Sequence, residues 1–379
     1  MKVLMIIDHF GLGGAQRQMV ELACGMKRRG HEVDMFSYFP KYDFFRPLLE
    51  EHRITLHEYA KGAGFSFGVL ARLIALLRER RFDVVVSYLN SPNIYAELAA
   101  PFAGGSKLVV SERVGHQDDK SPVRSFLRRA MHVVADKVVA NSRTHCDWLR
   151  RKWWLRNKAV YIYNGLNLQV FRPQQGAVES AGGLRLIAIG RVGPQKNILN
   201  LIAALGALQS ESGDSPQISW VGQRDESELD RPYCRRIDEA LESLPEIRRR
   251  WHWLGVRADV PELLRRHGAL IHPSFYEGLP NVVCEALATG IPVLASAVCD
   301  HPLLVAEGER GFLFDPESPQ SIAAAITRFT ALSVADRRRF SRNAREYAEA
   351  NLGVEKMVGA YESLFMQLLR GETRSATSG

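Results

Sequence analysis

The feature that most constrains this chain is an alternation of short apolar runs with longer segments of helical periodicity. Apolar runs of about four to eight residues between polar turns are typical of buried strands. They occur at 2–8, 31–38, 83–88, 107–113, 137–141 and 160–163, and again at 184–190, 218–221, 251–254, 269–271, 292–295 and 311–314. Strands that alternate with helices form doubly wound parallel sheets, so the sequence predicts an α/β protein with two Rossmann-like domains.

The length of 379 residues suits two domains. A Gln-, Gly- and Pro-rich segment separates the two sets of runs. We therefore predict a first domain at 1–167, a linker at 168–183 and a second domain at 184–354. Residues 371–379 have the composition of a disordered tail.

Composition narrows the class of protein. The five cysteines form no close pairs and no histidine cluster has metal-ligand spacing, which argues against a disulfide scaffold and a zinc site. The first apolar run is too short for a signal peptide, and no run approaches the ~20 residues of a membrane-spanning helix. We expect a cytoplasmic protein, soluble or peripheral to the membrane. Residues 1–167 hold 26 Lys and Arg against 16 Asp and Glu, whereas the remainder holds 24 against 26. The basic excess predicts an acidic partner for the first half.

The stretch 272–290 carries the strongest site signal. A strand ends at about residue 271, a polar turn follows, Pro280 is expected at the first helical position and Gly290 as a left-handed cap. This geometry would aim the N–H groups of Asn281–Val282 and a helix dipole at an anion. Glu277 and Glu285 bracket that site, and ionised carboxylates only accept hydrogen bonds. The pattern fits a phosphate between two polyols, as in a nucleotide-sugar; the alternative is two solvated acids.

The residues at 273–293, Pro-Ser-Phe-Tyr-Glu-Gly-Leu-Pro-Asn-Val-Val-Cys-Glu-Ala-Leu-Ala-Thr-Gly-Ile-Pro-Val, resemble the signature of retaining glycosyltransferases of family 4. The resemblance implies the GT-B fold, in which two Rossmann-like domains face each other across a cleft. It also implies that the first domain binds the acceptor, that the second binds the nucleotide-sugar donor, and that a C-terminal helix at about 355–370 crosses back to the first domain. The expected donor-binding residues in this stretch are Gly278, Leu279, Pro280, Asn281, Val282 and Glu285.

Two cations follow the strand 184–190. Arg191 and Lys196 can neutralise a diphosphate there, and their spacing resembles the donor-phosphate clamp of the family. An exposed charge pair is the alternative. Cleavage of a nucleoside diphosphate-sugar builds negative charge on the leaving group, which these cations and the amides of Asn281–Val282 would stabilise. No Asp-x-Asp pair is present, so we expect no metal and no cofactor beyond a UDP- or GDP-sugar substrate.

The glycine turn after the first strand has two interpretations. A dinucleotide fingerprint would need a third glycine where Gln16 stands, although Asp34 lies near the place of a ribose-binding acid. We interpret Gly13 and Gly14 as glycines that let the backbone approach the donor diphosphate. A tight turn without a ligand is the alternative. The family turn usually reads Gly-Gly-Ala-Glu, so Gln16 differs in charge.

The resemblance also implies roles for acids and a histidine. Glu277 would hold the donor sugar hydroxyls and Glu285 the ribose hydroxyls, with retention of anomeric configuration. A histidine near the reacting carbon is common in the family, and His116 after Ser111-Glu112-Arg113 is the candidate. His9 is the second possibility, and a merely solvated loop histidine is the alternative for both.

A basic aromatic segment points to a membrane. Residues 148–158 contain five cations and three tryptophans, which suits contact with lipid headgroups. The helix expected at 122–135 sets three arginines opposite an apolar face, which we expect to pack into the core: Val123, Leu127, Met131 and Val134. No nucleic-acid-binding module accompanies the tryptophans, so nucleic acid is not an expected partner.

The sequence thus predicts a hexosyltransferase-type glycosyltransferase that uses a nucleotide-sugar donor, a glycan or lipid-linked acceptor and an anionic membrane surface. A non-catalytic nucleotide-sugar-binding protein of the same fold is the alternative. A dehydrogenase is a more distant one.

Overall fold

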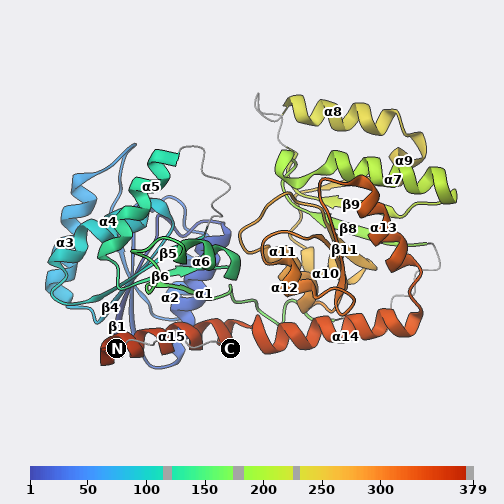
Figure 1. The fold of residues 1–379 in the computed structure, drawn as a ribbon. Helices are drawn as coiled ribbons and strands as arrows, with labels where there is room; N and C mark the ends of the chain where they lie inside the picture. Colours follow the sequence, from blue (N-terminus) through green and yellow to red (C-terminus); the bar gives the residue numbers. More distant parts are fainter. Residues whose placement is uncertain (114–121, 174–182, 225–230, 373–379) are drawn as a thin grey trace. The chain divides into compact units, whose positions relative to one another are not determined.

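Residues 1–113, 122–173, 183–224 and 231–372 are described by the computed structural model, except for the side chains of 122–124. The chain divides into two compact units (Figure 1). One comprises Met1–Gly165 together with Val354–Gly379, and the other is Leu166–Gly353. The sequence placed these boundaries at 167 and 354.

The first unit is built on a parallel seven-stranded sheet with the order β3-β2-β1-β4-β5-β6-β7. Its strands are β1 (Lys2–Ile6), β2 (Glu32–Ser37), β3 (Thr55–Glu58), β4 (Val84–Tyr88), β5 (Lys107–Glu112), β6 (Lys137–Ala140) and β7 (Ala159–Tyr161). Its helices are α1 (Gly14–Arg28), α2 (Arg46–Glu51), α3 (Phe67–Arg80), α4 (Asn90–Ala99), η1 (Ala100–Phe102), α5 (Pro122–Met131), η3 (His132–Val134), α6 (Arg143–Arg150) and α15 (Val354–Arg370).

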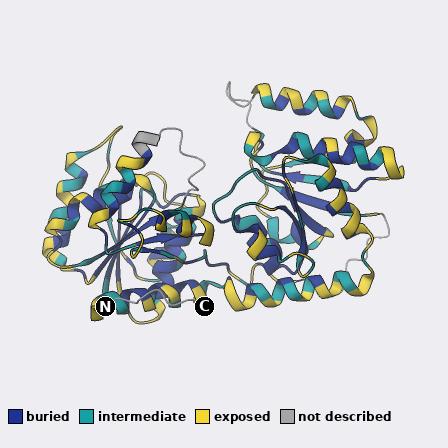
Figure 2. Ribbon diagram, viewed as in Figure 1, coloured by how far each residue is buried: buried dark blue, intermediate teal, exposed yellow. Residues whose placement is uncertain are grey.

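Burial on both faces explains the apolar runs of this sheet. Alternate residues of β1 enter two separate core clusters, Met5 with α1 and α15, and Leu4 with α3 and α4. The strands are accordingly buried while the helices expose their outer faces (Figure 2). The edge strand β3 escaped prediction because its four residues are only half-buried or exposed and have no apolar run.

The second unit has a parallel six-stranded sheet with the order β10-β9-β8-β11-β12-β13. Its strands are β8 (Arg185–Ile189), β9 (Gln217–Val221), β10 (Trp251–Gly255), β11 (Ala269–His272), β12 (Val293–Ser296) and β13 (Gly311–Phe314). Its helices are η4 (Pro194–Lys196), α7 (Ile198–Ser212), α8 (Arg231–Glu242), α9 (Pro245–Arg250), α10 (Val260–Arg265), α11 (Asn281–Ala288), α12 (His301–Val305), α13 (Pro319–Thr330) and α14 (Val334–Asn351). The prediction of two parallel α/β sheets is confirmed.

The C-terminal helices belong to different units. The helical pattern at 336–369 is two helices, because α14 ends at Asn351 and α15 begins at Val354. Helix α15 packs on α1 at Gly25, which leaves room for Val358. A Cβ at Gly25 would lie only 2.4 Å from Cγ2 of Val358. Arg29 also donates to Glu362 Oε2 at 2.6 Å. The expected return of the last helix to the first domain is confirmed.

The expected linker is anchored to the second unit where it is described. Leu166 pairs with Gly353 as an isolated parallel bridge. Arg345 of α14 donates to the carbonyl oxygens of Phe171 at 2.8 Å and Ala288 at 2.6 Å. Backbone carbonyls in 168–173 are therefore bonded to the second unit, although most of these residues are exposed, and 174–182 lie outside the described residues. Of the expected tail, Gly371 and Glu372 bond back to α15, and 373–379 also lie outside. No helix in the described parts of the chain is long and apolar enough to traverse a bilayer.

Candidate functional site

Loops from three neighbouring strands of the second unit meet at one edge of its sheet. After β8, Asn197 donates through Nδ2 to Pro273 O, at 3.1 Å, in the loop after β11. Gln195 donates to Tyr276 O at 2.8 Å in the same loop. The amide of Glu277 donates to Cys299 Sγ at 3.3 Å, in the loop after β12. Ligands of open parallel sheets bind at this carboxyl edge, so these loops form the candidate site.

A lysine, a glutamate and a histidine lie together in this site. Lys196 Nζ is 2.5 Å from Glu277 Oε1, and His272 Nε2 is 3.1 Å from the same oxygen. The Lys196 and Glu277 side chains are 16% and 12% exposed, so Glu277 is not a solvated loop acid. Burial would raise the pKa of Glu277, but the hydrogen bond from His272 and the charge of Lys196 hold it well below its usual range. Burial lowers the pKa of His272, which favours a neutral ring that donates from Nε2.

Glycines directly after β8 and β9 allow this close packing. Gly190 has φ +158°, and a Cβ there would lie 2.8 Å from Lys196 Cε. Gly222 has φ +148°, and its Cβ would lie 2.1 Å from Gly190 O. Both are conformations that favour glycine. Arg191 follows Gly190 and is exposed, and the backbone amide of its neighbour Val192 donates a hydrogen bond to Gln223 O at 2.8 Å.

Helix α11 begins one residue later than the sequence predicts. Pro280 is its N-cap, and the first intrahelical bond runs from Val283 N to Pro280 O at 3.0 Å. The amides of Asn281 and Val282 therefore precede the helical ladder, where backbone N–H groups favour an anion. Gly290 ends the helix with φ +71°, as expected of a left-handed cap.

The other donor residues predicted in the second unit lie in the turn after β11 or on α11. Leu279 is buried and Gly278 is half-buried in the turn before the helix. Glu285 is half-buried in the second turn of α11. Because β8 and β11 are neighbours, Arg191 and this helix follow adjacent strands at one sheet edge. Fixed cations, helix amides and an ionised carboxylate suit a ligand that has both phosphate and hydroxyl groups.

The glycine turn of the first unit is closed by Gln16. Gly13 caps α1, and the Gln16 side chain folds back so that its Nε2 donates to Asp8 Oδ1 at 2.9 Å. His9 accepts the amide of Gly11 through Nδ1 at 3.0 Å, so this histidine supports the turn itself. Gly14 is the first residue of α1.

Asp34, the acidic residue on which the dinucleotide-binding alternative depends, is not available to a ligand. Asp34 lies within β2 and is buried, with Oδ2 at 2.8 Å from His57 Nε2 and 3.2 Å from Arg80 Nη2. A ribose-binding acid has to present its oxygens to the ligand, and this carboxylate is held by protein groups. Asp34 therefore stabilises β2 and β3 in the structure.

His116 lies outside the described residues. The strand before it, β5, ends at Glu112 in a buried ionic cluster that the residue pattern does not predict. Glu112 accepts from His132 Nε2 at 3.0 Å, His145 Nε2 at 2.7 Å and Arg129 Nε at 3.3 Å. His132 also pairs through Nδ1 with Glu97. Burial lowers the pKa of His132, but the two carboxylates outweigh it and raise the pKa to about 9. The residue types were only a weak signal for this cluster, because its five charged or titratable side chains are spread over residues 97–145.

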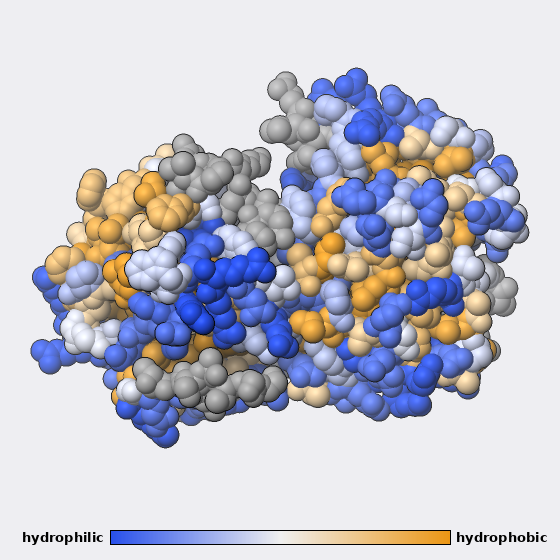
Figure 3. Space-filling model, in the orientation of Figure 1, coloured by the Kyte–Doolittle hydropathy of each residue, from blue (hydrophilic) through white to orange (hydrophobic). Residues whose placement is uncertain are grey.

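This cluster reverses the expected orientation of α5. Arg129 is 1% exposed, whereas Leu127 is 59% and Val134 is 45% exposed, so the apolar face predicted to enter the core does not do so. Met131 is half-buried, and the Val123 side chain lies outside the description. Phe126 of α5 is 55% exposed and packs edge-on against Trp154, which in turn packs edge-on against Trp153, a residue that is 83% exposed. Hydrophobic residues also gather on the surface over α3 and α5 (Figure 3).

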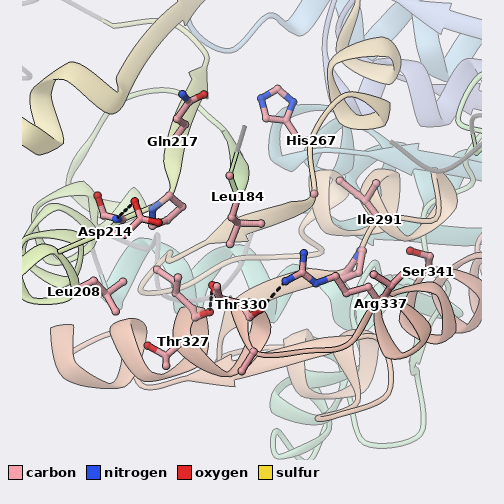
Figure 4. Close-up of a pocket in the computed structure, with 18 of the residues that line it drawn as sticks. Leu184, Leu208, Asp214, Gln217, His267, Ile291, Thr327, Thr330, Arg337 and Ser341 are labelled. Atoms are coloured by element: carbon pink, nitrogen blue, oxygen red, sulfur yellow. Dashed lines mark hydrogen bonds between the residues drawn. The ribbon is translucent and has the colours of Figure 1, made fainter. Parts of the chain in front are cut away.

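A cavity in the second unit lies away from the candidate site. Its volume is about 1370 Å³, and it is lined by residues at the amino ends of the strands, including Leu184, Gln217 and Pro292 (Figure 4). Arg337 donates to Thr330 O at 2.6 Å on its α13–α14 side. Ligands of doubly wound sheets bind at the opposite edge, so we do not assign the donor to this cavity.

Known proteins resemble the chain over both halves. The family described as "Glycosyl transferases group 1" matches residues 175–347, and "Glycosyltransferase Family 4" matches 12–170. EpsF of Bacillus subtilis (strain 168) is 30% identical over 319 residues, covering 78% of this chain and 79% of EpsF. Lipopolysaccharide glucosyltransferase WaaG of Escherichia coli (strain K12) is 23% identical, covering 91% and 93%. The structure of Anabaena HepE with UDP and glucose superposes with a TM-score of 0.78 at 21% identity, covering 97% of this chain and 100% of HepE.

Proposed function

The chain belongs to glycosyltransferase family 4 and is a glycosyltransferase, and from this premise we propose a retaining, metal-independent reaction. The sugar would pass from a nucleoside diphosphate-sugar to a lipid-linked or nascent polysaccharide acceptor. WaaG acts on lipopolysaccharide by its name, and another relative from Escherichia coli is named as a galactosyltransferase that uses a diphosphoundecaprenol-linked sugar. These names support an acceptor of the cell envelope.

The observation that carries the proposal is the cluster of Lys196, Glu277 and His272 beside the start of α11. An ammonium group has three donors, and Glu277 accepts one of them, so Lys196 retains donors for a diphosphate oxygen. Arg191 would add a planar cation, and the first amides of α11 would complete the stabilisation of the leaving group. Such preorganised charge needs no metal ion in order to act.

Glu277 is suited to bind rather than to attack. Its low pKa keeps it ionised at neutral pH, and a carboxylate that is already hydrogen-bonded to Lys196 and His272 is a poor nucleophile. Its remaining lone pairs can accept from the donor sugar hydroxyls, and Glu285 would accept from the ribose. The donor diphosphate would then take the acceptor proton during front-face attack.

Release of nucleoside diphosphate tests this proposal. Purified protein is incubated with UDP- or GDP-sugars and an acceptor extract, with and without EDTA, and UDP-sugars are tested first because HepE contains UDP. We expect acceptor-dependent release that EDTA leaves unchanged, and a loss of about 10²-fold or more in kcat for Arg191→Met and for Glu277→Gln. Arg248→Met on exposed α9 is the matched control. Product NMR should show the donor's anomeric configuration, and inversion would refute the retaining mechanism.

The non-catalytic alternative predicts a different outcome of the same assay. A nucleotide-sugar-binding protein would give a thermal shift with the donor but no release with any acceptor fraction. Turnover above that of Glu277→Gln would exclude it.

We further propose that α5, η3 and the segment 148–158 contact the cytoplasmic face of an anionic membrane. Leu127, Val134 and Trp153 supply exposed apolar groups, and the exposed cations Arg151 and Arg156 lie near Trp153 in the chain. Liposome flotation with 30% phosphatidylglycerol should recover the protein, and the double variant Leu127→Ser, Trp153→Ser should stay in the soluble fraction. Equal flotation of wild type and double variant would refute this surface, whereas Phe102→Ser, an exposed aromatic of η1, is expected to float normally.

A further inference from the structure

The cavity at the amino edge of the second sheet has no part in the reaction proposed above. It is lined by residues that directly precede five neighbouring strands, β10, β9, β8, β11 and β12. The carboxyl-terminal ends of α7 and α13 and the first half of α14 complete the lining (Figure 4). All these residues belong to the second unit, and the volume of about 1370 Å³ can hold a small organic molecule.

Part of this lining is apolar. Leu208 at the end of α7 and Ile326 on α13 are buried side chains of the core that reach the cavity. Leu184 and Ile291 approach it from the strand side (Figure 4). Apolar surface of this kind gains free energy when a ligand removes it from water, so it favours an apolar body on the ligand.

Two polar side chains of the lining lack a partner at one buried atom. Arg337 donates through Nη2 to Thr330 O at 2.6 Å, and its guanidinium group lies between Thr330 and Ile291 (Figure 4). Its Nε is buried without a hydrogen-bond partner in the described parts of the chain. Ser215 is 4% exposed, and its Oγ has no such partner either within those parts. Buried polar atoms are usually hydrogen-bonded, so these two atoms indicate oxygen atoms that a ligand can supply.

Cations outnumber carboxylates around the cavity. The lining residues of the described chain include four arginines and two acids: Arg250, Arg265, Arg337, Arg338, Glu211 and Asp214. Asp214 is already paired with Arg250 at 2.5 Å. The excess is local, because residues 168–379 as a whole hold 24 Lys and Arg against 26 Asp and Glu. It offsets the carbonyl ends of α7 and α13, which point to this edge and disfavour an anion. Guanidinium groups in such a setting favour a carboxylate or a phosphate.

The cavity also reaches the far end of the helix that begins at the candidate donor site. Thr289, Gly290 and Ile291 line the cavity and directly follow α11. The amide of Ile291 donates to Ala286 O at 3.1 Å, which bonds this end of the lining to the helix. Helix α11 has eight residues and is about 12 Å long. The cavity and the donor site therefore share one rigid element, through which occupancy of one can bias the other.

We propose that this cavity is an effector site for a small molecule that joins an apolar body to a carboxylate or phosphate group. The apolar body packs on Leu184 and Ile326, and the oxyanion accepts from the guanidinium group of Arg337. Binding there acts on the donor site through α11. The inference goes beyond the proposed function, because the site lies apart from the groups assigned to the reaction and binding does not require turnover.

Titration of matched probes into the full chain tests the site. The probes share one ring system: 2-naphthoate, 2-naphthyl phosphate and the neutral 2-naphthalenemethanol. Saturation-transfer NMR and calorimetry measure their dissociation constants. We expect at least one anionic probe to bind about tenfold more tightly than the neutral one. The stronger of the two anionic probes shows whether the site prefers carboxylate or phosphate.

Variants locate the probe in the cavity. Arg337→Met should weaken the anionic probe about tenfold and leave the neutral probe unchanged, which also shows that the variant is folded. Thr327→Trp, at an exposed position of the lining, should weaken both probes because the indole ring obstructs the cavity. Arg339→Met, exposed on the same helix and outside the lining, is the matched control and should bind as wild type. Arg191→Met removes a cation of the donor site and should also leave probe binding unchanged.

Hydrogen–deuterium exchange tests the effector role. The bound anionic probe should slow amide exchange in the peptide that contains α11. Unchanged exchange at saturating probe would refute the coupling. Equal affinity of the anionic and neutral probes, or wild-type affinity of Arg337→Met, would overturn the oxyanion site, and weaker binding by Arg191→Met would place the probe at the donor site instead. Probe binding by a protein without nucleotide-sugar turnover would contradict the proposed function and leave this site standing.

Discussion

The contact between Lys196 and Glu277 permits a quantitative prediction about the second unit. The two charges are 2.5 Å apart and about one-eighth exposed, and the residues are 81 positions apart in sequence. Coulomb attraction at an effective dielectric constant of 20 is about 4 kcal/mol at 4 Å. Part of this is offset because both ions were solvated in the unfolded chain. We expect a net coupling of about 2 kcal/mol, within the range found for contacting residues.

A double-mutant cycle measures this coupling. Lys196→Met leaves the buried carboxylate with His272 alone, and Glu277→Gln leaves the ammonium without its counter-charge. Each single variant should lose about 3 kcal/mol of unfolding free energy, because removal of one partner strands the other charge. The double variant should lose about 2 kcal/mol less than the sum of the two losses. Urea unfolding is followed by tryptophan fluorescence and calorimetry, with the two units fitted as separate transitions. Losses that add within about 0.5 kcal/mol would refute the assignment of an interacting buried pair.

Three further predictions concern stability. Gly222→Ala should destabilise the second unit by about 3 kcal/mol, because its Cβ would meet a backbone carbonyl oxygen. Gly213→Ala, with φ +70° and open space around the Cβ, should cost about 1 kcal/mol. Equal losses of unfolding free energy by calorimetry would contradict the steric argument. Neighbouring carboxylates raise the pKa of His132 from the ordinary 6.5 to about 9. The charged ring therefore contributes on the order of 3 kcal/mol to the free energy of unfolding below pH 6.5, and this contribution is lost as pH rises through 9. The urea midpoint of the first unit should fall over that interval in wild type but not in His132→Gln, and parallel pH profiles would refute this linkage. Arg345→Met should cost about 2 kcal/mol and increase proteolysis near residue 171, whereas exposed Arg342→Met should do neither in the same assays.

Much of the fold could be predicted from the sequence, because strands buried on both faces require continuous apolar runs. The runs located all the strands of the described chain except β3, which lies at a sheet edge where burial is partial. The strand, turn and helix around 272–290 were also readable, since proline and glycine mark where the helix begins and ends. Pro280 was misplaced by one residue because cap and first helical positions differ only in backbone angles.

The sequence by itself determined two parallel α/β sheets and the phosphate-favouring turn, because periodicity and turn residues act over a few neighbouring positions. Only the tertiary structure decided which charges meet. Glu277 contacts Lys196 because β8 and β11 are neighbours in the sheet. Arg129 points inward because it binds the buried carboxylate of Glu112. A helical pattern distinguishes two faces of a helix. It does not determine which face packs inward when a buried carboxylate needs a cationic partner from the polar face.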